Sequence, residues 1–223
     1  MVGGVYWEDV RGWHLEEKPC TKRAISAPSP PERRRHAGHQ RRLALVLVAC
    51  VAAGCQSLTT EWQSQAIDPG DSAIRFEHAG FDPKLAEYMV QRDPRSANAV
   101  YVARFTGADA FAVLAAVKTG PRYVVEERAT EAYVSDLLEN VKPDWGASGR
   151  VAAPIGIVPY RMFRLPGQSA SCVGFAQQVG QPADDRNRRK GIAFGYFCQN
   201  ETRPMSTEAA EDLIGKVSLG ARR

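Results

Sequence analysis

The chain has 223 residues, of which 44% are hydrophobic and 24% are charged, so it is long enough to form one globular domain with a core and is not disordered throughout. Its formal charge of +4 arises in residues 1–55, which hold nine of the 29 basic and five of the 25 acidic residues. The rest of the chain has 20 of each, which excludes the basic excess expected of a nucleic-acid-binding domain.

Residues 1–40 combine a proline-rich run, Ser26–Pro31, with a cluster of arginines and no sustained apolar period. This composition predicts a disordered segment. The alternative is that much of it precedes the true translation start, because the apolar region that follows begins unusually late for a signal sequence.

Residues 41–54 have the order of a secretory signal peptide: two arginines, the uncharged run Leu43–Ala53, and small residues at its end. The run has 11 residues, whereas a bilayer-spanning helix needs about 20. A removed signal peptide is therefore predicted, with a buried core helix as the alternative because the two share their composition.

The end of this run, Ala52-Ala53-Gly54-Cys55, resembles the lipobox of bacterial lipoproteins, although that class prefers Leu, Val or Ile where this chain has Ala52. The resemblance implies that Cys55 is lipidated and becomes the first residue of the mature chain. Gln56 resembles the residue that directs members of this class to the outer membrane. Acyl chains on Cys55 would hold the protein at the periplasmic face of that membrane without spanning it.

The mature chain is predicted to have a polar tether over 55–71 and a single α+β domain over 72–220. Asp82 and Pro83 suit the start of a helix, as does Thr130. The first half of the domain is therefore expected to mix helices and strands. The predicted helices cover 83–91, 107–118 and 130–141, and the predicted strands cover 98–105 and 122–127.

The second half is predicted to be an antiparallel meander of four strands joined by turns that contain proline or glycine. These strands cover 149–153, 157–165, 171–178 and 191–198. Ser206 is expected to cap a final helix that ends near Gly220 and covers one face of the sheet.

Cys172 and Cys198 are the two cysteines that remain after Cys55, and export would place them in an oxidising compartment where they can form a disulfide. If they face each other in an antiparallel hairpin, Gly174 faces Tyr196 and Phe175 faces Gly195, so each ring lies over a glycine. The bridge would contribute about 3.5 kcal/mol by loop-closure entropy. The alternative is two buried free thiols.

The mature chain has one histidine, His78, and no nucleotide-binding or serine-hydrolase motif, so no catalytic residue, metal site or cofactor is predicted. A Cys172 nucleophile with His78 as its base remains a minor alternative to the disulfide. Two sets of residues are candidate ligand contacts. They are Trp145 with Arg161 and Arg164, and the hairpin-tip residues Arg188 and Arg189.

Each set has a structural alternative: Trp145 as a lid on the core, and the tip arginines as an ordinary solvated turn. The strands Cys172-Val173-Gly174-Phe175 and Gly195-Tyr196-Phe197-Cys198 also resemble segments of small proteobacterial lipoproteins, and no activity comes with that resemblance.

The sequence thus predicts a non-enzymatic binding or scaffold module of the cell envelope, with the membrane, an envelope protein or peptidoglycan as partners. An accessory subunit of an envelope complex is the alternative, and a hydrolase with an unrecognised site is a third.

Overall fold

The structure is a computed structural model of the chain, and it describes residues 16–17, 62–138, 141–167, 169–183, 188–200 and 204–220. The predicted signal peptide and Cys55 lie outside the described residues. Within the described ranges, no helix is long and apolar enough to cross a membrane.

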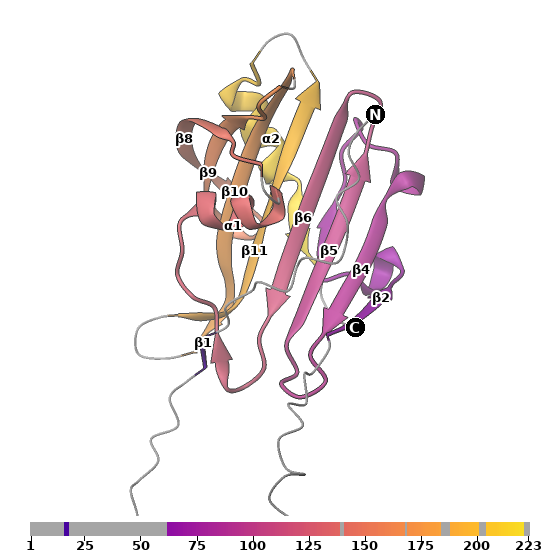
Figure 1. Cartoon of the computed structure of the whole chain (residues 1–223), viewed down its shortest axis with the longest axis vertical. Coiled ribbons are helices and arrows are strands. Elements are labelled where there is room, and N and C mark those ends of the chain that lie inside the picture. Colours follow the sequence, from indigo (N-terminus) through magenta and orange to yellow (C-terminus); the bar gives the residue numbers. More distant parts are fainter. Residues whose placement is uncertain are drawn as a thin grey trace, which may run out of the picture. The chain divides into compact units, whose positions relative to one another are not determined.

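An eight-stranded antiparallel sheet forms the centre of the domain, with the strand order β2-β4-β5-β6-β11-β10-β9-β8 (Figure 1). The long strands β6 and β11 join its two halves, although about 70 residues separate them in the sequence. The strands of this sheet are β2 (Gln63–Ala66), β4 (Glu87–Arg92), β5 (Ala99–Thr106), β6 (Ala110–Lys118), β8 (Asp144–Ala153), β9 (Gly156–Arg164), β10 (Ala170–Pro182) and β11 (Arg189–Asn200).

Two short antiparallel pairs accompany the sheet: β1 (Glu16–Glu17) with β7 (Tyr123–Val124), and β3 (Ile74–Phe76) with β12 (Val217–Leu219). The second pair matters for the site because it joins the first part of the domain to the segment that follows the last helix. Gly220 extends this pair by donating its N–H to the carbonyl of Ala73.

The two helices in the described part of the chain cover opposite faces of the sheet (Figure 1). On one face, called the α1 face, α1 (Thr130–Leu138) buries Val134 and Leu137 against Phe194 and its neighbours. On the other, called the α2 face, α2 (Thr207–Gly215) and the β3–β12 pair cover a core that includes Phe175 and Phe197. The central strands of the sheet, such as β6 and β11, are therefore buried on both sides.

The predicted α+β fold is wrong, because the fold is mostly β and the segments 83–91 and 107–118 are not helices. The first segment makes only one 3-10 turn, η3 (Pro83–Leu85), where the Asp82 side chain accepts a hydrogen bond from the Lys84 N–H at 2.9 Å. It then continues as β4. Leu85, expected on the buried side of a helix, is 56% exposed.

The second segment is the central strand β6, which is apolar on both sides. Ala112, Leu114 and Ala116 pack on the α2 face, and Val113 and Val117 pack on the α1 face. A strand buried on both faces has no polar alternation, so a short apolar run of this kind does not distinguish a strand from a helix. Its alanines favour a helix in isolation, and the tertiary contacts override that preference.

The strands predicted in the second half are present as β8 to β11, but they do not form a separate four-stranded meander. They are one half of the eight-stranded sheet, and the first half of the domain supplies the rest. Ser206 caps α2 as expected, with its Oγ accepting a hydrogen bond from the Ala209 N–H at 3.2 Å. The helix ends at Gly215 rather than near Gly220, because the residues that follow form β12 (Val217–Leu219). β2, at 63–66, places part of the segment 55–71 in the sheet.

Candidate functional site

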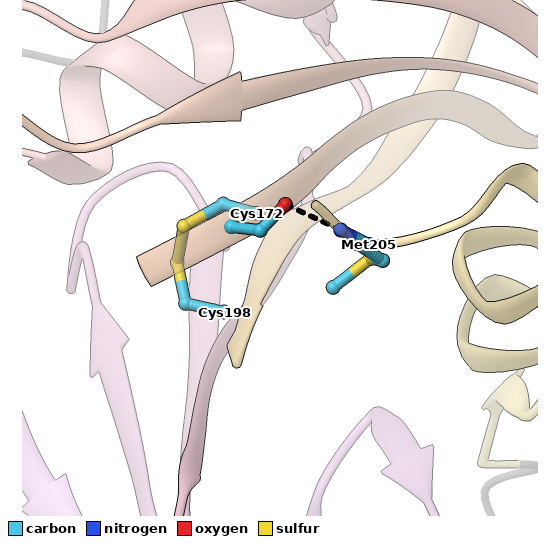
Figure 2. The surroundings of a disulfide bond; sticks show 4 residues. Cys172, Cys198 and Met205 are labelled. Carbon is cyan, nitrogen blue, oxygen red and sulfur yellow. Dashed lines mark hydrogen bonds between the residues drawn. A yellow bond between two sulfur atoms is a disulfide. The ribbon is translucent and has the colours of Figure 1, made fainter. Parts of the chain in front are cut away.

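The disulfide between Cys172 and Cys198 is present, and it joins directly opposite residues of β10 and β11 (Figure 2). The pairing also places Gly174 opposite Tyr196 and Phe175 opposite Gly195, as the sequence predicts. Next to the bridge, Ser171 Oγ accepts a hydrogen bond of 2.7 Å from the Met205 N–H, which holds the segment before α2 against β10. This end of the hairpin is therefore a structural clamp.

The two cysteines and His78 lie on opposite faces of the sheet. Both cysteines belong to the core of the α1 face, whereas His78 lies beside Phe76 and Phe81 of the α2 face. A bridged thiol cannot act as a nucleophile, and this one lies on the wrong side of the sheet for an imidazole base at position 78.

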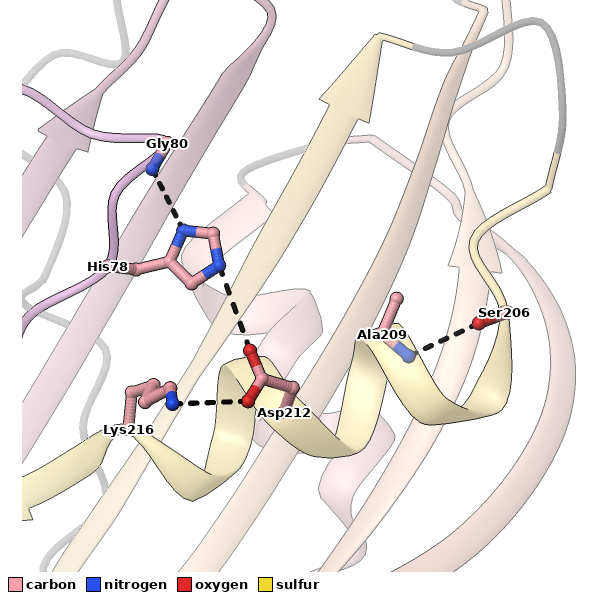
Figure 3. A network of polar contacts seen from close by, with 6 residues as sticks. All are labelled: His78, Gly80, Ser206, Ala209, Asp212 and Lys216. Carbon is pink, nitrogen blue, oxygen red and sulfur yellow. Dashed lines mark hydrogen bonds and ion pairs between the residues drawn. The ribbon is translucent and has the colours of Figure 1, made fainter.

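His78 instead takes part in a polar network that links the end of β3 to α2 (Figure 3). Its Nδ1 accepts a hydrogen bond of 3.0 Å from the Gly80 N–H, so the ring proton of neutral His78 is on Nε2. Nε2 lies 3.8 Å from Asp212 Oδ2, and the same carboxylate forms an ion pair with Lys216 at 3.2 Å. The contacts hold α2 against the loop after β3.

Trp145 and Arg161, the first two candidate contacts, lie together on the α1 face. The Arg161 guanidinium is 5.8 Å from the Trp145 ring centre, and its Nε donates to the carbonyl of Gly146 at 3.3 Å. It also forms an ion pair with Glu131 at the start of α1, and this hydrogen bond holds the pKa of Glu131 below its ordinary value. Trp145 in turn packs on Phe163 at 5.0 Å between ring centres.

These contacts occupy both side chains within the fold. Trp145 covers the edge of the core of the α1 face, and Arg161 joins α1 to the β8–β9 hairpin. The arrangement has the geometry of a lid on the core rather than that of an open ligand platform.

The remaining candidate arginines lie at opposite ends of the sheet. Arg164 is opposite Ser171 at the start of β10, whereas Arg189 is opposite Pro182 at its end, 11 residues further along the strand. At about 3.3 Å per residue, this corresponds to roughly 36 Å. Arg189 donates to the carbonyl of Gly180, and Arg188 precedes it in the hairpin. The five candidate contacts therefore do not form one site.

A groove on the α2 face is a site that the sequence does not reveal. It has a volume of about 1540 Å³ and lies between the large sheet on one side and the β3–β12 pair with the turn η2 (Pro69–Asp71) on the other. Tyr101 and Ala116, opposite each other on β5 and β6, form part of its floor and are buried. Leu219 of β12 lines it from the other side and is 39% exposed.

A row of cross-strand neighbours leads across the sheet at this groove. Arg92 of β4 is opposite Ala99 of β5, which is opposite Lys118 of β6, which is opposite Gly191 of β11. Directly opposite residues share a face of the sheet, so both basic side chains project on the groove side. Small residues flank Lys118 on both neighbouring strands and leave space around its side chain.

The groove has an excess of basic residues. Arg92 and Lys118 project into it from the sheet, Arg75 and Lys190 also line it, and Asp71 is the one acidic residue among the groove-lining residues that the structure describes. The Lys190 side chain points to the other face of β11, and its Nζ donates to the carbonyl of Pro121 at 2.7 Å. Lys118 and Arg75 form no ion pair with any residue in the described ranges. Arg92 Nη1 donates to Gln65 Oε1 at 3.4 Å, which leaves its charge uncompensated. The groove therefore has an excess of positive charge available for an anionic ligand.

Across the described ranges, no group of three or more His, Cys, Asp or Glu residues could hold a metal ion. No protein-family model, curated protein or solved structure matches this chain. The residues of the groove therefore carry the functional argument on their own.

Proposed function

We propose that this protein is a non-enzymatic binding module of the cell envelope, held to the membrane through lipid on Cys55, and that the basic groove of the α2 face is its binding surface. The groove carries the proposal. It combines a partly apolar lining with basic side chains that no described residue neutralises, which is the composition of a surface that takes up an anionic partner.

The disulfide supports the envelope location, because structural disulfides form and persist in oxidising compartments. The order of basic, apolar and small residues before Cys55 supports export and lipidation. The alternative, an accessory subunit of an envelope complex, uses the same groove with a protein as the bound partner.

Lipidation is tested by feeding radiolabelled palmitate to a Gram-negative host that expresses the full chain. We expect label in the wild type and in Cys50→Ser, and no label in Cys55→Ser. Cys50→Ser is the matched control because Cys50 lies in the same apolar run, five residues before the proposed lipidation site. Label that persists in Cys55→Ser would rule out Cys55 as the lipidated residue.

The binding surface is tested by photo-crosslinking in the same cells. A benzophenone amino acid replaces Leu219 in the groove or, as a control, Ile157, which is 68% exposed at the start of β9 and is not part of the groove. We expect a discrete adduct from position 219, its loss in Arg92→Glu/Lys118→Glu, and none from position 157. Equal adducts from both positions, or none from position 219, would contradict the groove as the binding surface.

A further inference from the structure

We infer that the ligand of the basic groove is an acidic peptide segment in an extended conformation, supplied by a partner protein. This inference rests on the proposed function, because it names the ligand of the same groove. It follows from the size of the groove, the spacing of its charges and the chemistry of its rim.

The size of the groove favours a chain over a compact small molecule. Its volume of about 1540 Å³ exceeds the roughly 300–1,000 Å³ of typical small-ligand sites. The lining residues run across six neighbouring strands, from Gln65 on β2 to Val179 on β10. At about 4.8 Å per strand, this is roughly 24 Å, or the length of about seven extended residues.

The spacing of the charges fits acidic side chains on such a chain. Arg92 and Lys118 lie two strands apart in one cross-strand row, which places their backbones roughly 10 Å from each other. In an extended chain of polyproline II conformation, residues three positions apart lie on the same side and span about 9 Å, which is nearly the same distance. Two acidic residues three positions apart on the peptide would therefore lie near Arg92 and Lys118, one at each base.

The polar rim suits a peptide better than an alkyl chain. Gln65 and Gln181 line the groove, and each amide offers donors and an acceptor to a peptide backbone. Apolar side chains such as Leu219 and Val179 lie among these polar groups. An acyl chain would cover the apolar side chains but leave the amides and the charges unpaired, whereas an extended acidic peptide would satisfy both.

The test measures binding of fluorescein-labelled eight-residue peptides to the purified full chain by fluorescence anisotropy at low salt. The probe contains serine, alanine and two glutamates three positions apart, and the two control peptides carry glutamine or lysine at the glutamate positions. We expect the glutamate peptide to bind more tightly than both controls, and its affinity to fall as salt rises.

The protein variants locate this binding. We expect Arg92→Gln/Lys118→Gln to weaken binding of the glutamate peptide about tenfold, because two exposed charge pairs are lost. Arg150→Gln removes an exposed base of β8 outside the groove and should leave the affinity within about twofold. Equal binding by the double variant, or by the glutamine peptide, would overturn the inference.

A last arm distinguishes a peptide from a lipid headgroup. Displacement of the bound probe by glycerol phosphate, at the concentration at which unlabelled glutamate peptide displaces it, would show a phosphate site and overturn the peptide assignment. If the peptide fails to bind while the position-219 adduct forms, the ligand class is wrong and the groove still binds a partner. If the adduct also fails, the proposed binding surface is wrong.

Discussion

Gly174 on β10 lies where α1 packs closely on the sheet, so its replacement by alanine tests that contact directly. A Cβ atom at position 174 would lie 2.7 Å from Val134 Cγ2 and 3.2 Å from Val134 Cγ1. Valine cannot easily turn away, because a β-branched side chain has one strongly preferred rotamer in a helix. Either α1 must shift or Val134 must become strained. We expect Gly174→Ala to lower the free energy of unfolding by about 2 kcal/mol.

The assay is urea denaturation followed by circular dichroism, with Gly146→Ala as the control. A Cβ at position 146 of β8 would have its nearest neighbour at 3.5 Å, an ordinary contact, so this variant should change stability by less than about 0.5 kcal/mol. In a Val134→Ala background, Gly174→Ala should cost at least about 1 kcal/mol less than in the wild type. An equal cost in both backgrounds would refute the close packing of α1 on Gly174.

Three further predictions concern the disulfide, the α1 ion pair and the α2 cap. Replacing Cys172 and Cys198 together by alanine should cost about 3.5 kcal/mol in urea denaturation, from the 26-residue separation of the bridge, and unchanged stability would contradict this. Glu131→Gln should lower the free energy of unfolding by about 0.5 kcal/mol at pH 7, because the ion pair with Arg161 is lost. Because the pKa of Glu131 is lowered from 4.5, the stabilisation by the pair is fully present above that pH, and the difference from the wild type should shrink as the pH falls through the lowered pKa. Ser206→Ala should cost about 1 kcal/mol in thermal melts, because the N–H three residues further on loses its acceptor.

The pairing of β10 with β11 could be predicted residue by residue, because its signals are local. Cys172 and Cys198 set the register, and glycine stands opposite an aromatic ring at positions 174 and 195. A hairpin needs no information from distant parts of the chain, so its cysteines, glycines and turn residues are enough to define it.

The class of the fold could not be predicted in the same way, because β6 is buried on both faces and has neither a helical nor an alternating period. The groove was missed for a related reason. Arg92 and Lys118 come from β4 and β6, and each is a single base after an apolar strand in the sequence. Only the order of the strands in the sheet brings them into one row, and no local pattern encodes that order.

The short length of α2 explains why its face of the sheet is not covered from end to end. α2 has nine residues, or roughly 14 Å of helix, whereas β10 has 13 residues, or roughly 43 Å of strand. The helix is therefore about a third as long as the strand, and β3 and β12 add only three residues each. Where this cover ends, the residues on the sheet must suit water. Two residues further inward along β4 and β6, the cross-strand row holds the buried Val90 and Ala116, whereas the row at the outer end holds Arg92 and Lys118. The change from apolar to basic residues at this step marks the edge of the core, and it makes the groove an open, charged surface rather than an unfilled part of the core.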